Sequence, residues 1–254
     1  MEFTADAGLS GYQGFFYYTG TMSSVTNNGT LRKAASQTGS TSITVTFNNN
    51  SAVEVLSGTL ALGSSTTGSS SAVATYSVSS GALLNFTSSH TFSSGASLSG
   101  AGTARFSGGT ITANGITVSC ASELTAGTFT ATGTNSFTTL TMSGGTLNGT
   151  GSVTTSSLLT WSAGTMSGTG STTANGGLTI STTNSKFLDT RSLTLAAGSG
   201  TYTNYGTVYL SNSATFTNNS TLEFTRRRHS AVGFHKPLTP KGFRVFRSSD
   251  CAMD

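Results

Sequence analysis

The sequence predicts an all-β protein, a parallel β-solenoid with coils of about 18–20 residues. Three observations predict it: short segments in which apolar and polar residues alternate, glycine-containing corners that recur at a fixed spacing, and abundant β-forming residues. Ser and Thr account for 92 of the 254 residues, whereas charged residues make up only 8%. No apolar run approaches the roughly 18 residues of a membrane-spanning helix, so no membrane span is expected in this chain.

The first segment, residues 1–20, is aromatic and does not repeat. Residues 3–6 and 14–18 are expected to form two short strands that are joined by a polar turn.

The second segment, residues 21–225, alternates with the period of two that is typical of half-buried strands. The apolar members of these segments flank Ser, Thr, Glu or Tyr; they are Ile43, Val45, Phe47, Val53, Val55, Ile116, Val118, Leu178, Ile180, Leu193, Leu195, Val208, Leu210, Leu222 and Phe224. A flexible Gly/Ser linker has no such periodicity, so we expect an ordered stack of coils.

The corners between these strands recur along the same segment. Gly109, Gly127, Gly145 and Gly164 each precede a threonine, and their sequence numbers rise in steps of 18, 18 and 19. Repeats this short are typical of single solenoid coils, in which Gly and Asn occupy turns that need a positive φ. About eleven coils, each about 4.8 Å high, would give a rod about 50 Å long.

The third segment, residues 226–254, is basic and is expected to be a disordered tail. It carries seven basic and two acidic residues, a net charge of +5, whereas residues 1–225 carry five basic and six acidic residues, a net charge of −1. The pI of 9.3 therefore describes the tail. Because the body has no basic stripe, no nucleic-acid partner is expected. A tail produced by intron read-through or a shifted frame is an alternative.

The Ser-Gly-Gly-Thr corners, the Leu-Asn-Gly-Thr-Gly corner that starts at Leu147 and the Asn-Asn-Ser units near Asn49 and Asn218 resemble repeats of bacterial filamentous-haemagglutinin and adhesin proteins. The resemblance extends over the second segment, which is most of the chain. It implies a right-handed, single-stranded parallel β-helix in a secreted or cell-surface protein. The periodicity itself also allows a left-handed helix.

Residues 3–6 and 14–18 resemble the last two strands of a CUB domain. The resemblance implies that Asp6 is one ligand of an incomplete calcium site, because one carboxylate cannot satisfy an ion that takes six to eight oxygens. Both resemblances together imply a fragment of a longer secreted protein.

The titratable groups of the body do not form a pattern that suggests catalysis. Glu54 and Glu223 lie at similar repeat positions but about nine coils apart, far beyond the roughly 5–9.5 Å between the carboxylates of glycan-cleaving enzymes. Asp189 and Arg191 are expected to form a surface ion pair, and His90 to be structural or exposed. We therefore expect a non-enzymatic protein without a cofactor.

Two kinds of surface site remain as alternatives. Exposed aromatic residues such as Tyr205 and Tyr209 would stack against sugars and make the chain a carbohydrate-binding module. Threonine triplets could form a lattice of the kind found in ice-binding solenoids; they start at Thr44, Thr110 and Thr130.

The sequons at Asn28, Asn85 and Asn148 are candidate glycosylation sites in a eukaryotic secretory pathway. Other corner asparagines are expected to stack as hydrogen-bonded ladders: Asn49, Asn50, Asn218 and Asn219. Cys120 and Trp161 are expected in the core.

The sequence thus predicts an extracellular or cell-surface structural segment, a stalk or spacer of the adhesin type. Its partners would be glycans or other surface proteins. A carbohydrate-binding module is the alternative, followed by a polysaccharide-active enzyme or an ice-binding solenoid.

Overall fold

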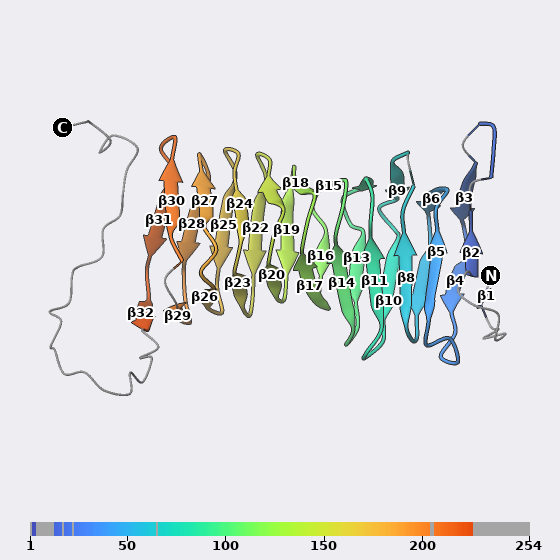
Figure 1. Cartoon of the computed structure of the whole chain (residues 1–254), viewed down its shortest axis with the longest axis horizontal. Helices are drawn as coiled ribbons and strands as arrows, with labels where there is room; N and C mark the ends of the chain where they lie inside the picture. The colour runs from blue at the N-terminus through green and yellow to red at the C-terminus, as the bar shows by residue number, and fades with distance from the viewer. Residues whose placement is uncertain are drawn as a thin grey trace, which may run out of the picture.

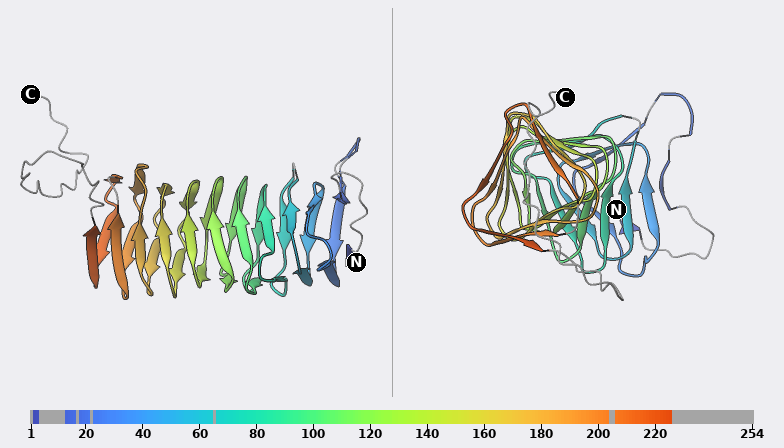
Figure 2. Two further views of the ribbon diagram at one scale, coloured as in Figure 1. Left: turned by 60° about the horizontal axis from the view of Figure 1, so that its bottom comes forward. Right: turned by 60° about the vertical axis from the view of Figure 1, so that its left-hand side comes forward.

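The computed structural model describes residues 2–3, 13–16, 18–21, 23–64, 66–203 and 206–225. These residues form 32 strands and no helix. The strands wind into a β-solenoid with three sheets of 11, 11 and 10 strands, which we name sheets A, B and C. Figure 1 shows the strands stacked in chain order along one axis, and the near end-on view in Figure 2 shows the coils superimposed around a common interior.

The strands enter the three sheets in strict rotation, and each strand inside a sheet pairs in parallel with the strands three places before and after it. Sheet A contains β1 (Glu2–Phe3), β4 (Thr30–Lys33), β7 (Ala52–Val55), β10 (Thr75–Val78), β13 (Ser97–Ser99), β16 (Thr117–Val118), β19 (Thr134–Phe137), β22 (Ser152–Thr155), β25 (Ser171–Ala174), β28 (Ser192–Leu195) and β31 (Thr215–Asn218).

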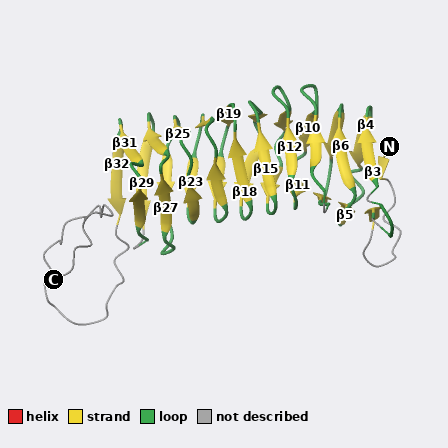
Figure 3. Ribbon diagram, turned by 90° about the horizontal axis from the view of Figure 1, so that it is seen from above, coloured by secondary structure: helices red, strands yellow, loops and turns green. Residues whose placement is uncertain are grey.

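Sheet B contains β2 (Gln13–Phe15), β5 (Ser40–Ile43), β8 (Thr59–Leu62), β11 (Leu83–Phe86), β14 (Thr103–Phe106), β17 (Ala121–Leu124), β20 (Leu140–Met142), β23 (Leu159–Trp161), β26 (Leu178–Ile180), β29 (Ser199–Thr203) and β32 (Thr221–Thr225). Sheet C contains β3 (Ser24–Asn27), β6 (Thr46–Asn49), β9 (Gly68–Ser70), β12 (His90–Phe92), β15 (Thr110–Ala113), β18 (Thr128–Ala131), β21 (Thr146–Asn148), β24 (Gly164–Met166), β27 (Lys186–Asp189) and β30 (Val208–Ser211). Figure 3 shows the same stack from above.

The predicted coil length holds in the middle of the rod and is exceeded towards its ends. Thr103 pairs with Ala121 and Leu140 pairs with Leu159, so the offsets in sequence number are 18 and 19. Towards the N-terminus, Thr59 pairs with Leu83, an offset of 24. The extra residues lie in connections, since five residues separate β8 from β9, and the strands stay in register.

The interior is a continuous apolar stack, as the alternation predicts. Each coil contributes one residue to an inner column on sheet B, and successive members are register partners. The column consists of Ile43, Leu62, Phe86, Phe106, Leu124, Met142, Trp161, Ile180, Tyr202 and Phe224. Phe224, on the last described strand, is 52% exposed. Trp161 is fully buried and Cys120 is 1% exposed, so both predictions of a core position are confirmed.

The column of corner glycines is confirmed as well. Gly109, Gly127, Gly145 and Gly164 all have positive φ and precede or begin successive strands of sheet C. A Cβ on each of the last three would clash with the carbonyl oxygen of the preceding glycine in the column. Glycine is therefore required both for the turn and for the approach of consecutive coils.

The similar Asn-Asn-Ser units do not occupy equivalent positions. The unit at Asn49 connects β6 to β7, from sheet C to sheet A, whereas the unit at Asn218 connects β31 to β32, from sheet A to sheet B. Consequently Glu54 lies on sheet A and Glu223 on sheet B, and the expected equivalence of these two residues is wrong. The Asn-Asn-Ser unit specifies only a turn between two strands. Because every corner of the coil joins two strands, the unit does not determine which corner it occupies.

The described parts of residues 1–20 extend the solenoid. Phe3 pairs in parallel with Lys33, and Phe15 pairs in parallel with Ile43. The boundary at residue 20 and the resemblance to a CUB domain remain predictions. Asp6, Tyr205 and residues 226–254 lie outside the described residues.

Candidate functional site

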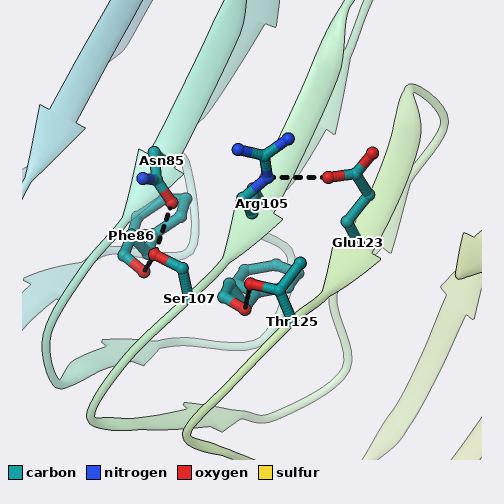
Figure 4. Close-up of polar contacts among 7 residues, drawn as sticks. Asn85, Phe86, Arg105, Ser107, Glu123 and Thr125 are labelled. Atoms are coloured by element: carbon teal, nitrogen blue, oxygen red, sulfur yellow. Dashed lines mark hydrogen bonds and ion pairs between the residues drawn. The ribbon is translucent and has the colours of Figure 1, made fainter. Parts of the chain in front are cut away.

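A column of hydroxyl groups follows sheet B and organises the corner that leads to sheet C. On coil after coil, the residue immediately after the last inward residue of sheet B is Ser or Thr. Thr87, Ser107, Thr125 and Ser162 each donate a hydrogen bond to a main-chain carbonyl of the preceding coil, over 3.0–3.4 Å. Figure 4 shows Ser107 and Thr125 in this role on adjacent coils.

Gly63 breaks this column. It stands between Thr44 and Thr87, and a Cβ at Gly63 would overlap Thr87 Oγ1. Gly63 also begins one of the longer connections, since five residues separate β8 from β9. A hollow lies on the outside of the rod beside this connection.

We name this hollow the corner depression. Its volume is about 280 Å³, and its lining comes from three consecutive coils: Ser42, Ile43, Thr44, Ala61, Gly63, Ser64, Thr87 and Ser88. Five of these eight residues carry hydroxyl groups and none carries a charge. Gly63, Ser64 and Ser88 also line a smaller cavity of about 10 Å³ that reaches His90.

His90 lines this smaller cavity and is 3% exposed. Its Nε2 is 2.7 Å from Ser70 Oγ, which in turn is 2.6 Å from the hydroxyl of Tyr76. Burial lowers the pKa of His90 to about 3 and raises the pKa of Tyr76, so both groups are neutral near pH 7. The expectation of a structural histidine is confirmed.

The Ser70–His90 pair has the residue types of a nucleophile and its base, but burial removes it from any substrate. Ser70 is 1% exposed, and its second partner is the Tyr76 phenol, not a carboxylate. Ser70 and His90 share a face because each is an inward residue of sheet C on consecutive coils. The alternation of the sequence predicts inward positions, but it does not predict the strand register that brings Ser70 next to His90.

Tyr209 lies on the outer face of β30 and is 43% exposed. It stacks on Phe187 of β27, its register partner, with ring centroids 5.3 Å apart and planes at 16°. Phe187 is 46% exposed and was not among the predicted site residues, although it occupies a polar position of the alternation. We name these two residues the aromatic pair.

Asp189 lies two residues from Phe187 on the same outer face. Its Oδ1 accepts hydrogen bonds from Asn212 Nδ2 at 2.6 Å, Ser211 Oγ at 3.1 Å and Thr190 Oγ1 at 3.2 Å. The bond from Asn212 contributes most to lowering the pKa of this carboxyl. Asp189 therefore provides a fixed negative charge beside the aromatic pair.

The expected surface ion pair between Asp189 and Arg191 is wrong. Arg191 is fully buried and donates five hydrogen bonds, one to Thr172 Oγ1 and four to main-chain carbonyls. The carbonyls belong to Gly149, Gly151, Ser167 and Ser171 on two preceding coils. Burial lowers the pKa of Arg191 to about 10, which still leaves it charged near pH 7.

The candidate sequons differ in accessibility. Asn28 is exposed at a corner, where its Oδ1 accepts a bond from Asn50 Nδ2 at 2.9 Å. Asn85 and Asn148 are partly buried, and their Oδ1 atoms accept bonds from Ser107 Oγ and the Gly149 amide, respectively. Figure 4 shows the bond to Asn85.

Of the predicted asparagine ladders, the one near the N-terminal end is confirmed as single hydrogen bonds between adjacent coils. Asn27 Nδ2 donates to Asn49 Oδ1 at 2.8 Å inside the rod, and Asn50 donates to Asn28 outside it. Asn218 is in register with Leu195, so the expected ladder there is wrong; its Oδ1 accepts the amide of Ser220 in its own turn.

Opposite charges on the outer face align across coils. Arg32 and Glu54 are register partners with Nε and Oε2 2.6 Å apart, and Arg105 and Glu123 repeat this arrangement on sheet B at 2.7 Å. The second pair is drawn in Figure 4. Within the described part of the chain, no group of three or more His, Cys, Asp or Glu residues could hold a metal ion.

The threonine triplets align only locally. Thr110 and Thr112 on β15 are in register with Thr128 and Thr130 on β18, whereas Thr44 lies outside the strands. These two strands place four threonine hydroxyl groups on one outer face.

The fold thus defines a parallel β-solenoid with a hydroxyl-rich exterior. Comparison of the chain with protein-family models, curated proteins and solved structures finds no match. The described residues include no helix that could cross a membrane.

Proposed function

We propose that this chain is a non-enzymatic structural segment, a stiff stalk or spacer of the adhesin type, in an extracellular or cell-surface protein. The observation that carries the proposal is the unbroken parallel pairing of 11 strands in each of two sheets and of 10 in the third. Bending such a rod requires hydrogen bonds to lengthen across several sheets at once. Each coil contacts mainly its neighbours, so the length of the rod is set by the number of coils.

The exterior supports the same proposal. On sheet A, one outer column carries a hydroxyl on eight consecutive coils, and its members are register partners from β10 to β31. They are Thr75, Ser97, Thr117, Ser136, Thr154, Thr173, Thr194 and Thr217. Neutral hydroxyl groups hydrate the rod without the repulsion that like charges on stacked strands would produce.

Limited proteolysis combined with electron microscopy tests the proposal. We expect protease to leave residues 23–203 intact and single particles to be straight rods of one length. Rapid cleavage at several corners within these residues, or strongly bent particles, would contradict a stiff spacer. Antibody labelling of intact source cells tests the surface location; labelling only after permeabilisation would contradict it.

The aromatic pair supports a second candidate function, carbohydrate binding. The two half-exposed rings offer an apolar face, and Asp189 with its hydrogen-bond partners lies beside them. A sugar could stack on such an apolar face while its hydroxyl groups bond to the polar neighbours. A glycan array tests it with Tyr209→Ala and Phe187→Ala, with Tyr18→Ala as the control because Tyr18 is 95% exposed elsewhere. Reproducible binding that only the first two variants lose would favour this function; no reproducible binding by the wild type would reject it.

A further inference from the structure

The corner depression combines three features that do not occur together on the other coils of the described rod. The hydroxyl column is interrupted at Gly63, five residues separate β8 from β9, and a smaller cavity that shares Gly63, Ser64 and Ser88 with the hollow is lined by a buried histidine. Thr87 Oγ1 occupies the space that a side chain at Gly63 would need. The hollow itself is lined by residues of three consecutive coils.

The lining indicates the chemistry of a ligand. Ser42, Thr44, Ser64, Thr87 and Ser88 bring hydroxyl groups, which both donate and accept hydrogen bonds. The hydroxyls of Thr44 and Thr87 already donate to the carbonyls of Phe15 and Leu62, so toward a ligand these two would act as acceptors. Ala61 and Ile43 supply apolar surface between them. Since no lining side chain is charged, nothing in the depression would compensate the desolvation of an ionic ligand.

His90 adds a polar group that is not fully used. Its Nε2 is bonded to Ser70, while its Nδ1 makes no hydrogen bond among the described residues. This Nδ1 edge faces Gly68, where a Cβ would lie only 2.7 Å away, and Gly68 and His90 line the same inner cavity. A cavity of about 10 Å³ holds at most about one water molecule, so His90 would reach a ligand in the depression through water.

The size limits the ligand to a small molecule. A volume of about 280 Å³ lies just below the roughly 300–1,000 Å³ of typical ligand pockets. One sugar ring fits such a space and an oligosaccharide does not.

We propose that the corner depression binds one neutral, polyhydroxylated ring, a single pyranose or the terminal pyranose of a glycan. Hydroxyl groups of the lining would exchange hydrogen bonds with those of the sugar, and Ala61 would contact its apolar face. This site is independent of the aromatic pair and does not depend on the function as a spacer.

Saturation-transfer NMR on the full chain tests the proposal with glucose, galactose and mannose, and with glucuronic acid and glucosamine as charged counterparts. We expect at least one neutral sugar to receive saturation and the charged sugars to bind at least tenfold more weakly. Absence of transfer to all three neutral sugars, or equal binding of the charged ones, would overturn the proposal.

Two filling variants locate the site. Ala61→Phe and Ser42→Tyr place a ring in the depression from adjacent strands, because these residues are outward register partners on β8 and β5. Ala121→Phe is the matched control, since Ala121 is an exposed outer residue of β17 in the same sheet. Either filling variant should weaken binding at least tenfold, and the control should leave it unchanged. Full binding by a folded filling variant would overturn the assignment to the corner depression. This conclusion holds whatever the effect of Tyr209→Ala, because Tyr209 belongs to the separate aromatic pair.

Discussion

A Cβ atom on Gly127 would lie 2.5 Å from the carbonyl oxygen of Gly109, the corner glycine of the preceding coil. Real Cβ atoms do not approach a carbonyl this closely, so a side chain at Gly127 would force two coils apart. The close contact between consecutive coils at this corner therefore explains why glycine recurs there in the sequence.

Gly127→Ala should lower the free energy of unfolding by about 3 kcal/mol or more, because positive φ and the backbone clash act together. Gly81→Ala separates the two causes: Gly81 has φ of 76° but no atom within 4 Å of the position that a Cβ would take, so about 1 kcal/mol is expected. Gly39→Ala, with neither feature, should change stability by less than about 1 kcal/mol. Chemical denaturation measures all three; equal losses at Gly127 and Gly39 would contradict the stacked corner.

Arg191→Met should lower stability by about 3 kcal/mol, because it removes five hydrogen bonds that join three coils. Arg105→Met is the control, since Arg105 is a partly exposed surface residue whose ion pair contributes at most about 1 kcal/mol. The comparison is made by urea denaturation. An Arg191→Met protein as stable as the Arg105→Met protein would show that the buried guanidinium does not hold the coils together.

His90 should make the stability depend on pH. Its pKa is about 3 in the folded chain and about 6.5 when unfolded, so between these values the unfolded state binds the additional proton. Stability is therefore complete above about pH 6.5 and falls as the pH decreases towards 3, by a few kcal/mol in total. Thermal unfolding of wild type and His90→Phe across this range measures the effect, and an equally steep decrease in both proteins would exclude His90 as its source.

The Arg105–Glu123 pair should contribute little. Both side chains are about one-third exposed, which screens their attraction, so a double-mutant cycle should give a coupling of about 0.5 kcal/mol. The coupling should decrease in 1 M salt. A coupling above about 2 kcal/mol, or one that does not respond to salt, would contradict a solvent-screened pair.

Local patterns predicted the strands and the glycine corners well, because alternation and positive φ are properties of a few consecutive residues. Trp161, Cys120 and the inner apolar columns follow from the same alternation. The face of the rod on which a motif lies could not be predicted, since this depends on the lengths of all intervening coils. The placement of Glu54 and Glu223 on different sheets is the consequence.

The candidate sites could not be predicted from local sequence patterns alone, because they also depend on which strands pair and in which register. Phe187 and Tyr209 are 22 positions apart in the sequence, and the parallel register of β27 with β30 makes them neighbours. Gly63 is recognised as a break in the hydroxyl column only when it is aligned with Thr44 and Thr87 on the adjacent coils. Arg191 occupies a corner position, where its burial depends on carbonyl groups of much earlier coils, such as that of Gly149.

The spacing between coils is the sharpest test of the stacked solenoid. Thr75 and Thr217 are exposed members of one outer column of sheet A and are separated by seven register steps. At about 4.8 Å per step, their backbones should lie about 34 Å apart. Electron–electron double resonance between spin labels at Thr75→Cys and Thr217→Cys, with the native cysteines replaced, should give one narrow distribution near this distance once the label length is included. A broad distribution, or a maximum far from this value, would contradict the stack of paired coils.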